Sequence, residues 1–155
     1  MHDGLNKSRT GIDGLDIVTF GGLPAGRPTL LCGGAGCGKT LFALTFLVNG
    51  ATQYSEPGVF MSFEEHAEDL AANVSSLGYD IDALVADNRL IIDHVHIERS
   101  EIEESGEYDL EGLFVRLRYA IEKVGARRVV LDTIEALFSG LTDTAILREI
   151  GRAHV

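Results

Sequence analysis

Apolar residues along the chain form short runs that are separated by longer stretches with helical spacing. Four of these short runs have the composition of buried strands, because they are largely apolar or contain many β-branched and aromatic residues. The runs are Thr29–Cys32, Val59–Phe63, Arg89–Val95 and Arg127–Asp132. We therefore predict four strands, each bounded by turn residues or by a helical stretch.

Three stretches between these runs have the spacing of helices. Leu41–Ala51 is apolar on nearly all sides, which predicts a helix buried on more than one face. Ala67–Leu77 has a helical pattern that Gly78 ends. The third stretch, which ends at Gly125, has apolar residues every three or four positions: Leu110, Leu113, Phe114, Leu117, Ile121 and Val124. A further helix is expected to begin at Thr142–Thr144.

The alternation of strands and helices predicts an α/β fold with a mostly parallel sheet and helices on both faces. Ligands in such folds bind at the carboxyl ends of the strands. The glycine-rich segments Gly11–Asp16 and Gly21–Pro28 are expected to form turns before the first strand. The acidic stretch from Glu98 to Glu111 is expected to be a solvated loop, and a partner-binding loop is the alternative.

The segment GGAGCGKT lies between the first predicted strand and the first predicted helix, and it completes a Walker A pattern. Its glycines allow successive N–H groups to point at phosphate oxygens, and the following helix presents its positive end to the same anion. Lys39 adds a charge for the β- and γ-phosphates, and the Thr40 hydroxyl can bind Mg²⁺. The pattern therefore predicts a site for ATP with Mg²⁺, formed by Gly33, Gly34, Ala35, Gly36, Cys37, Gly38, Lys39, Thr40 and Leu41.

Acidic residues follow two other predicted strands. Asp132 ends the apolar strand VVL, where its carboxylate would lie beside the loop and hold Mg²⁺ through water. Glu64 and Glu65 follow VFMSF, and a carboxylate there can orient and deprotonate an attacking water or hydroxyl. Each acid also has a structural interpretation, because Asp132 could cap a turn and Glu65 could favour a helix dipole.

Composition narrows the class of protein. A chain of 155 residues with 45% hydrophobic residues can form one domain with a core. Its net charge of −11 makes a nucleic-acid surface an unfavoured interpretation. The sequence shows neither a signal peptide nor a membrane span, which indicates a cytoplasmic protein. Cys32 and Cys37 are interpreted as reduced thiols, and the histidines His94 and His96 as solvent or core residues rather than metal ligands.

Several motifs together are more specific than the Walker A pattern alone. The segments TGIDGLD, GGLPAGRPTLLCGGAGCGKT, EPGVFMSFEE, LGYD and RRVVLDT resemble the KaiC family, whose members are circadian clock ATPases and autokinases of the RecA-like P-loop class. The resemblance extends from about Arg9 to about Phe138.

The resemblance implies roles for particular residues and for the assembly. Glu64 and Glu65 match the family's catalytic pair, Asp132 matches its Walker B acid, and Ser76 and Leu77 match positions that line the nucleotide. Family domains assemble as hexameric rings with ATP between subunits, and full-length members phosphorylate their own serine and threonine residues. Clock partner proteins are implied by the same likeness.

The family domain is longer than this chain, so residues 1–148 are expected to be a partial RecA-like domain, truncated at the C-terminus. Residues 149–155 read EIGRAHV, which matches the translation of a common sequencing adapter. We therefore expect a non-native tail there. The alternative is a genuine short helix end.

Two other functions remain open at this point. One is a DNA-handling ATPase of the RecA or RadA type, which the acidic composition disfavours. The other is a scaffold that binds ATP without hydrolysing it. Substitution of Glu64 and Glu65 by Gln would separate hydrolysis from binding.

Overall fold

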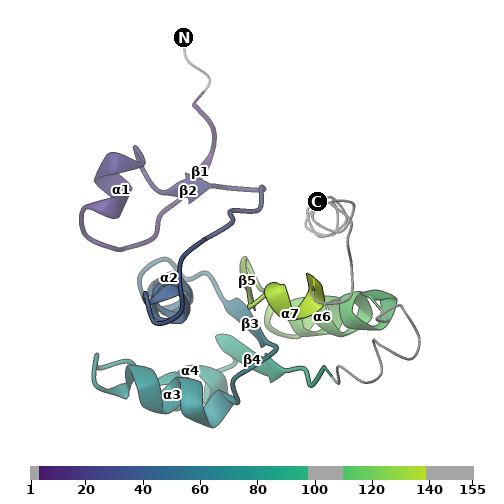
Figure 1. The fold of residues 1–155 in the computed structure, drawn as a ribbon. Coiled ribbons are helices and arrows are strands. Elements are labelled where there is room, and N and C mark those ends of the chain that lie inside the picture. The colour runs from purple at the N-terminus through teal and green to yellow at the C-terminus, as the bar shows by residue number, and fades with distance from the viewer. Residues whose placement is uncertain (1–3, 98–109, 139–155) are drawn as a thin grey trace.

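The computed structural model describes residues 4–97 and 110–138 and contains a parallel three-stranded sheet (Figure 1). The central strand is β3 (Gly58–Ser62), with β4 (Leu90–His94) on one side and β5 (Arg128–Asp132) on the other. Val59 lies opposite both Ile91 and Val129, so all three strands are in register. The predictions of strands at Val59–Phe63, Arg89–Val95 and Arg127–Asp132 are thereby confirmed to within a residue or two at each end.

Helices cover both faces of this sheet, as the alternating pattern predicted (Figure 1). The first face packs against α2 (Lys39–Gln53), α3 (Ala67–Ser75) and α4 (Ile81–Ala86). The second face packs against α6 (Leu110–Val124) and α7 (Glu135–Phe138). The arrangement is consistent with the RecA-like α/β fold that the sequence predicted.

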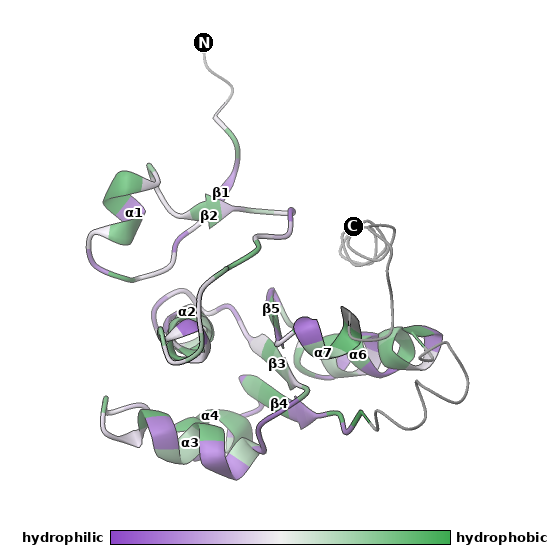
Figure 2. Ribbon diagram, in the orientation of Figure 1, coloured by the Kyte–Doolittle hydropathy of each residue, from purple (hydrophilic) through white to green (hydrophobic). Residues whose placement is uncertain are grey.

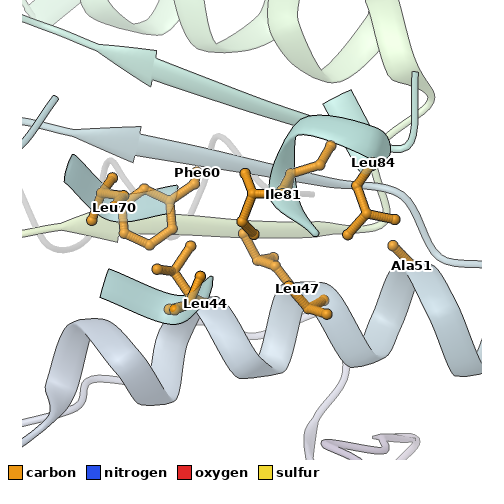
Figure 3. Close-up of a cluster of buried hydrophobic side chains, with 10 residues drawn as sticks. Leu44, Leu47, Ala51, Phe60, Leu70, Ile81 and Leu84 are labelled. Atoms are coloured by element: carbon orange, nitrogen blue, oxygen red, sulfur yellow. The ribbon is translucent and has the colours of Figure 1, made fainter. Parts of the chain in front are cut away.

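Alternation along β3 divides the core into two layers. Phe60 points to the first face, where it is fully buried among Leu44, Leu47 and Leu70 (Figure 3). Val59 and Met61 are two positions apart, so both point to the second face, where they pack against α6. Each fully buried apolar side chain of this size stabilises the fold by about 1.5–3 kcal/mol before entropy is counted.

The prediction of a buried strand at Thr29–Cys32 is wrong. This segment has no regular secondary structure, and Leu30 and Leu31 are 60% and 43% exposed. Within the described residues, β5 pairs only with β3, and the segment does not join either edge of the sheet. An apolar run becomes a strand only when its N–H and C=O groups find a partner edge, and the composition of the run does not supply one.

Among the described residues, three short elements precede the glycine-rich loop, where only turns were expected. β1 (Lys7–Ser8) pairs antiparallel with β2 (Leu23–Pro24), and α1 (Leu15–Val18) lies between them. Figure 2 shows α1 as mostly hydrophobic, although Ile17 and Val18 are exposed. The segment is held together by the carboxylate of Asp16, which accepts hydrogen bonds from the backbone and hydroxyl of Thr10 and from the backbone of Gly11.

Helix α4 was not predicted either, although its start carries a recognisable signal. Asp80 caps the helix by accepting a hydrogen bond from the Ala83 N–H at 2.9 Å. Asp is a preferred N-cap residue, and Asp80 lies shortly after Gly78 and directly before an apolar residue. The start of this helix could therefore have been predicted from the sequence.

Other expectations concern the rest of the chain. The helix start at Thr142–Thr144 and the tail at residues 149–155 lie outside the described residues, as does most of the acidic stretch. The prediction that Glu111 belongs to a solvated loop is wrong, because Glu111 lies in the first turn of α6. Its negative charge favours the helix N-terminus. Within residues 4–97 and 110–138, no helix has both the length and the apolar character needed to cross a membrane.

Candidate nucleotide-binding site

The glycine-rich loop leads directly into α2 through residues with left-handed backbone conformations. Gly36 has φ 74° and Gly38 has φ 94°, which side chains with a Cβ rarely adopt. Gly38 is the N-cap of α2, so the free N–H groups at the start of that helix face the loop. A helix N-terminus with its dipole behind it is a favourable place for phosphate oxygens.

The loop is tight as well as exposed. The Cys37 N–H donates to the Gly34 carbonyl at 3.3 Å, and a Cβ added at Gly33 would overlap Cys37 Sγ. Glycine is therefore required at position 33 because the Cys37 side chain lies too close for a Cβ, and not because of an unusual φ angle. A narrow loop whose backbone stays accessible fits a phosphate chain better than a loop filled by side chains.

Lys39 is folded back over its own loop. Its Nζ donates to the Gly33 carbonyl at 2.6 Å and to the Gly34 carbonyl at 3.0 Å. The ammonium group thus lies beside the loop backbone, where phosphate oxygens could replace the two carbonyls as its partners.

Thr40 and Asp132 meet across the site although 92 positions separate them. The Thr40 hydroxyl donates to Asp132 Oδ2 at 2.6 Å. This bond joins the first turn of α2 to the carboxyl end of β5. Both groups supply oxygen, which is the ligand type that Mg²⁺ prefers, so the residues present fit a magnesium site.

The segment after β3 places Glu64 and Glu65 at the same edge of the sheet. The Phe63 N–H donates to the Asp132 carbonyl at 2.9 Å, so the chain leaves β3 beside the end of β5. Glu64 is exposed, whereas Glu65 is half-buried and its Oε2 accepts a hydrogen bond from Asn73 Nδ2 at 3.3 Å. One carboxylate of the pair is thus held in place and the other is accessible to a ligand.

A pair of histidines lies next to these glutamates. The rings of His66 and His94 have centroids 4.1 Å apart and are tilted by 40°. Partial burial is the largest cause of a lowered pKa at His94, and electrostatic interactions with His66, His96 and Arg116 lower this pKa further. Asp93 acts in the opposite direction. The sequence interpretation treated His94 as an ordinary strand residue, and only the fold brings His66 against it.

The remaining predicted site residues are more peripheral. Leu41 lies in the first turn of α2 and is 41% exposed. Ser76 and Leu77 are exposed and follow α3, so they lie at the opposite end of that helix from Glu65. In the part of the chain that the structure describes, no three or more His, Cys, Asp or Glu side chains are grouped as a metal site.

Known proteins share this combination of segments. A family model described as "ATPase: KaiC" matches residues 8–153. The chain is 61% identical over 144 residues to a circadian clock protein KaiC2 of Synechocystis sp., covering 93% of the chain and 25% of that relative. It is 43% identical to a circadian clock oscillator protein KaiC of Parathermosynechococcus lividus, covering 94% and 27% of the two chains.

A third relative gives the same result. The circadian clock oscillator protein KaiC of Synechococcus elongatus is 41% identical over 147 residues, which cover 95% of the chain and 28% of the relative. The chain thus spans about a quarter of the length of these relatives. The family match and these identities, together with the loop and its acidic partner, show that the chain belongs to the KaiC ATPase family.

Proposed function

We propose that this chain binds ATP with Mg²⁺ and hydrolyses it to ADP and inorganic phosphate. The observation that carries the proposal is the 2.6 Å hydrogen bond between Thr40 and Asp132. It unites a glycine-rich helix start with an acidic strand end, and Glu64 and Glu65 leave the neighbouring strand at the same edge. Membership of the KaiC ATPase family supports this interpretation.

The loop from Gly33 to Thr40 would bind the phosphates through its N–H groups. Lys39 would exchange the two loop carbonyls for phosphate oxygens, which keeps its ammonium group hydrogen-bonded in both states. Leu41, Ser76 and Leu77 are proposed as further nucleotide contacts from the family resemblance.

Thr40 and Asp132 would hold the magnesium ion, Asp132 through water. When it is bound, the ion neutralises charge on the phosphate oxygens. The Thr40 oxygen would then present a lone pair to the ion, whereas in the present structure its O–H donates to Asp132.

Glu64 or Glu65 would orient a water molecule and accept its proton as the water oxygen attacks the γ-phosphorus. The bond between the γ-phosphorus and the bridging oxygen then breaks, and ADP leaves. Glu64 is the more accessible of the two carboxylates, whereas Glu65 is held by Asn73. We therefore propose Glu64 as the base and Glu65 as the residue that fixes the turn.

Charge-neutral substitution tests this division of roles. Glu64→Gln should lower kcat by roughly 100-fold or more, while ATP affinity stays within about two-fold of the parent. Glu65→Gln should have a smaller effect, and the exposed Glu68→Gln on α3 serves as the matched control. Nucleotide binding without turnover in the parent protein would overturn hydrolysis and would indicate a binding scaffold instead.

The names of the relatives extend the proposal to the whole protein. These relatives are named as circadian clock proteins. We propose that the protein carrying this chain is cytoplasmic and assembles into a hexameric ring. We also propose serine/threonine autokinase activity and contacts with clock partner proteins for it. Analytical ultracentrifugation with ATP, and phosphosite mapping after incubation with labelled ATP, test the ring and the kinase separately.

A further inference from the structure

The turn that carries Glu64 and Glu65 is anchored on one side by Ser62. The Ser62 hydroxyl donates to the Glu65 carbonyl at 2.6 Å and accepts from the Glu65 N–H at 3.0 Å. Ser62 is itself buried at the end of β3. This double hydrogen bond closes the turn but leaves its outer side, where His66 follows, without support from Ser62.

The support on that side comes from His94 at the end of β4. The His66 ring lies 4.1 Å from the His94 ring, measured between centroids. His66 is also the N-cap of α3, yet its side chain makes no capping hydrogen bond. The ring contact, rather than a cap, thus holds the side chain of the residue immediately after Glu65.

His94 is a firm base for this contact. The Val95 N–H donates to the Ser62 carbonyl at 2.8 Å, which ties the end of β4 to the end of β3. Arg116 on α6 donates to the His94 carbonyl at 3.2 Å and from Nε to Asp93 Oδ2 at 2.6 Å. The backbone of His94 is therefore fixed from two neighbouring elements.

We propose that the His66–His94 ring pair is a positioning device that holds the Glu64–Glu65 turn in place for ATP hydrolysis while His94 is neutral. The inference rests on the proposed function, because it assigns a support to the carboxylates that would activate water. His66 and His94 are positioning residues, since neither needs to touch the nucleotide.

Charges around the pair make the neutral state of His94 important. The groups that act on His94 are His66 at the start of α3, Asp93 and His96 on and beyond β4, and Arg116 on α6. A proton on His94 would place a positive charge beside Arg116, and the repulsion would displace the His94 ring from the His66 ring, whose centroid lies 4.1 Å away. Hydrolysis should therefore decline in mild acid because the turn loosens.

Two variants separate ring packing from titration in the protein that carries this chain. His94→Ala removes the contact and should lower kcat by about ten-fold at pH 8, with the KM for ATP changed by less than about two-fold. The double variant His66→Phe with His94→Phe keeps two rings in contact that cannot titrate. It should retain kcat at pH 8 and lose the decline in mild acid. His96→Phe is the matched control and should leave kcat near the parent value.

A second readout does not depend on hydrolysis. Hydrogen exchange at the Glu65 amide, which is bonded to Ser62 Oγ, reports whether the turn is closed. His94→Ala should accelerate this exchange, and the double phenylalanine variant should restore it.

The outcomes are distinct. An unchanged kcat and unchanged exchange in His94→Ala overturn the proposal, as does faster exchange with full kcat. An acid decline that persists in the double variant overturns the role of the neutral state. If the parent protein does not hydrolyse ATP, the proposed function fails. In that case, unaltered exchange at the Glu65 amide in His94→Ala would also overturn the role of His94 as a support. Accelerated exchange in His94→Ala would show that the ring pair still supports the turn.

Discussion

Arg128 donates a hydrogen bond from Nη2 to the carbonyl of Arg9 at 2.7 Å, across 119 positions of sequence. The same guanidinium donates to the Phe46 carbonyl at 2.8 Å and to Glu56 Oε2 at 2.6 Å, and it lies over the rings of Phe46 and Tyr54. Arg128 is only 3% exposed. One buried side chain at the start of β5 therefore ties the N-terminal segment to α2 and to the loop before β3.

Loss of this arginine should be costly. Arg128→Met retains the aliphatic stem but leaves two carbonyl groups and Glu56 without their partner, which we expect to lower the free energy of unfolding by about 3 kcal/mol. Urea denaturation followed by circular dichroism measures the change. Arg118→Met, at an exposed position on α6, is the control and should change stability by less than about 0.5 kcal/mol. Equal effects at both positions would contradict this role.

Gly50 in α2 provides space for that arginine. An alanine in a helix interior is usually favoured over glycine by about 1 kcal/mol. A Cβ at Gly50 would lie 2.6 Å from Arg128 Nε, however, and overpacking costs about 1–3 kcal/mol. We therefore expect Gly50→Ala to destabilise the protein. The exposed Gly112→Ala on α6 should stabilise it, and a stabilising Gly50→Ala in the same denaturation series would show that Arg128 can move aside.

Asp16 should make the N-terminal segment sensitive to acid. Burial raises its pKa, but hydrogen bonds from Thr10 and Gly11 and the charge of Arg9 outweigh burial, so the pKa lies below the ordinary 3.8. The stabilisation that this lowered pKa provides is present above pH 3.8 and is lost as the pH falls through the folded-state pKa.

Asp16→Asn should therefore lower the melting temperature at pH 7, and the difference from the parent should shrink toward pH 3. Thermal melts at half-unit pH intervals measure this convergence. Asp13→Asn, at a neighbouring exposed position, is the control. A constant difference at every pH would mean that the Asp16 charge is not responsible.

Lys39 and Asp132 should differ in what they contribute to nucleotide binding. Lys39→Met removes a charged donor worth about 1.5–3 kcal/mol, so we expect ATP affinity to fall by about ten-fold to 100-fold. Asp132→Asn should instead weaken the dependence of binding on Mg²⁺. Titration calorimetry with and without Mg²⁺ separates the two effects. A Lys39→Met variant with unchanged affinity would contradict a role for its ammonium group in phosphate binding.

Part of the fold was readable from local pattern. The strands at Val59–Phe63 and Arg127–Asp132 are short and apolar, and α6 repeats its apolar positions with helical spacing. Helix α4 and the small pair β1–β2 were missed because two-residue strands and a six-residue helix carry little periodic signal. Thr29–Cys32 was predicted as a strand because its composition is apolar, whereas pairing depends on a partner edge.

By itself, the sequence determined the glycine-rich loop before α2, because glycine spacing acts through local backbone geometry and places Lys39 and Thr40 at the start of one helix. It also determined the alternation that produces a parallel sheet covered on both faces. Only the tertiary structure decided that Thr40 meets Asp132, that Arg128 reaches Arg9 and that the His66 ring lies against the His94 ring. These contacts join residues far apart in the chain, and their geometry depends on strand register and helix packing, which local spacing does not encode.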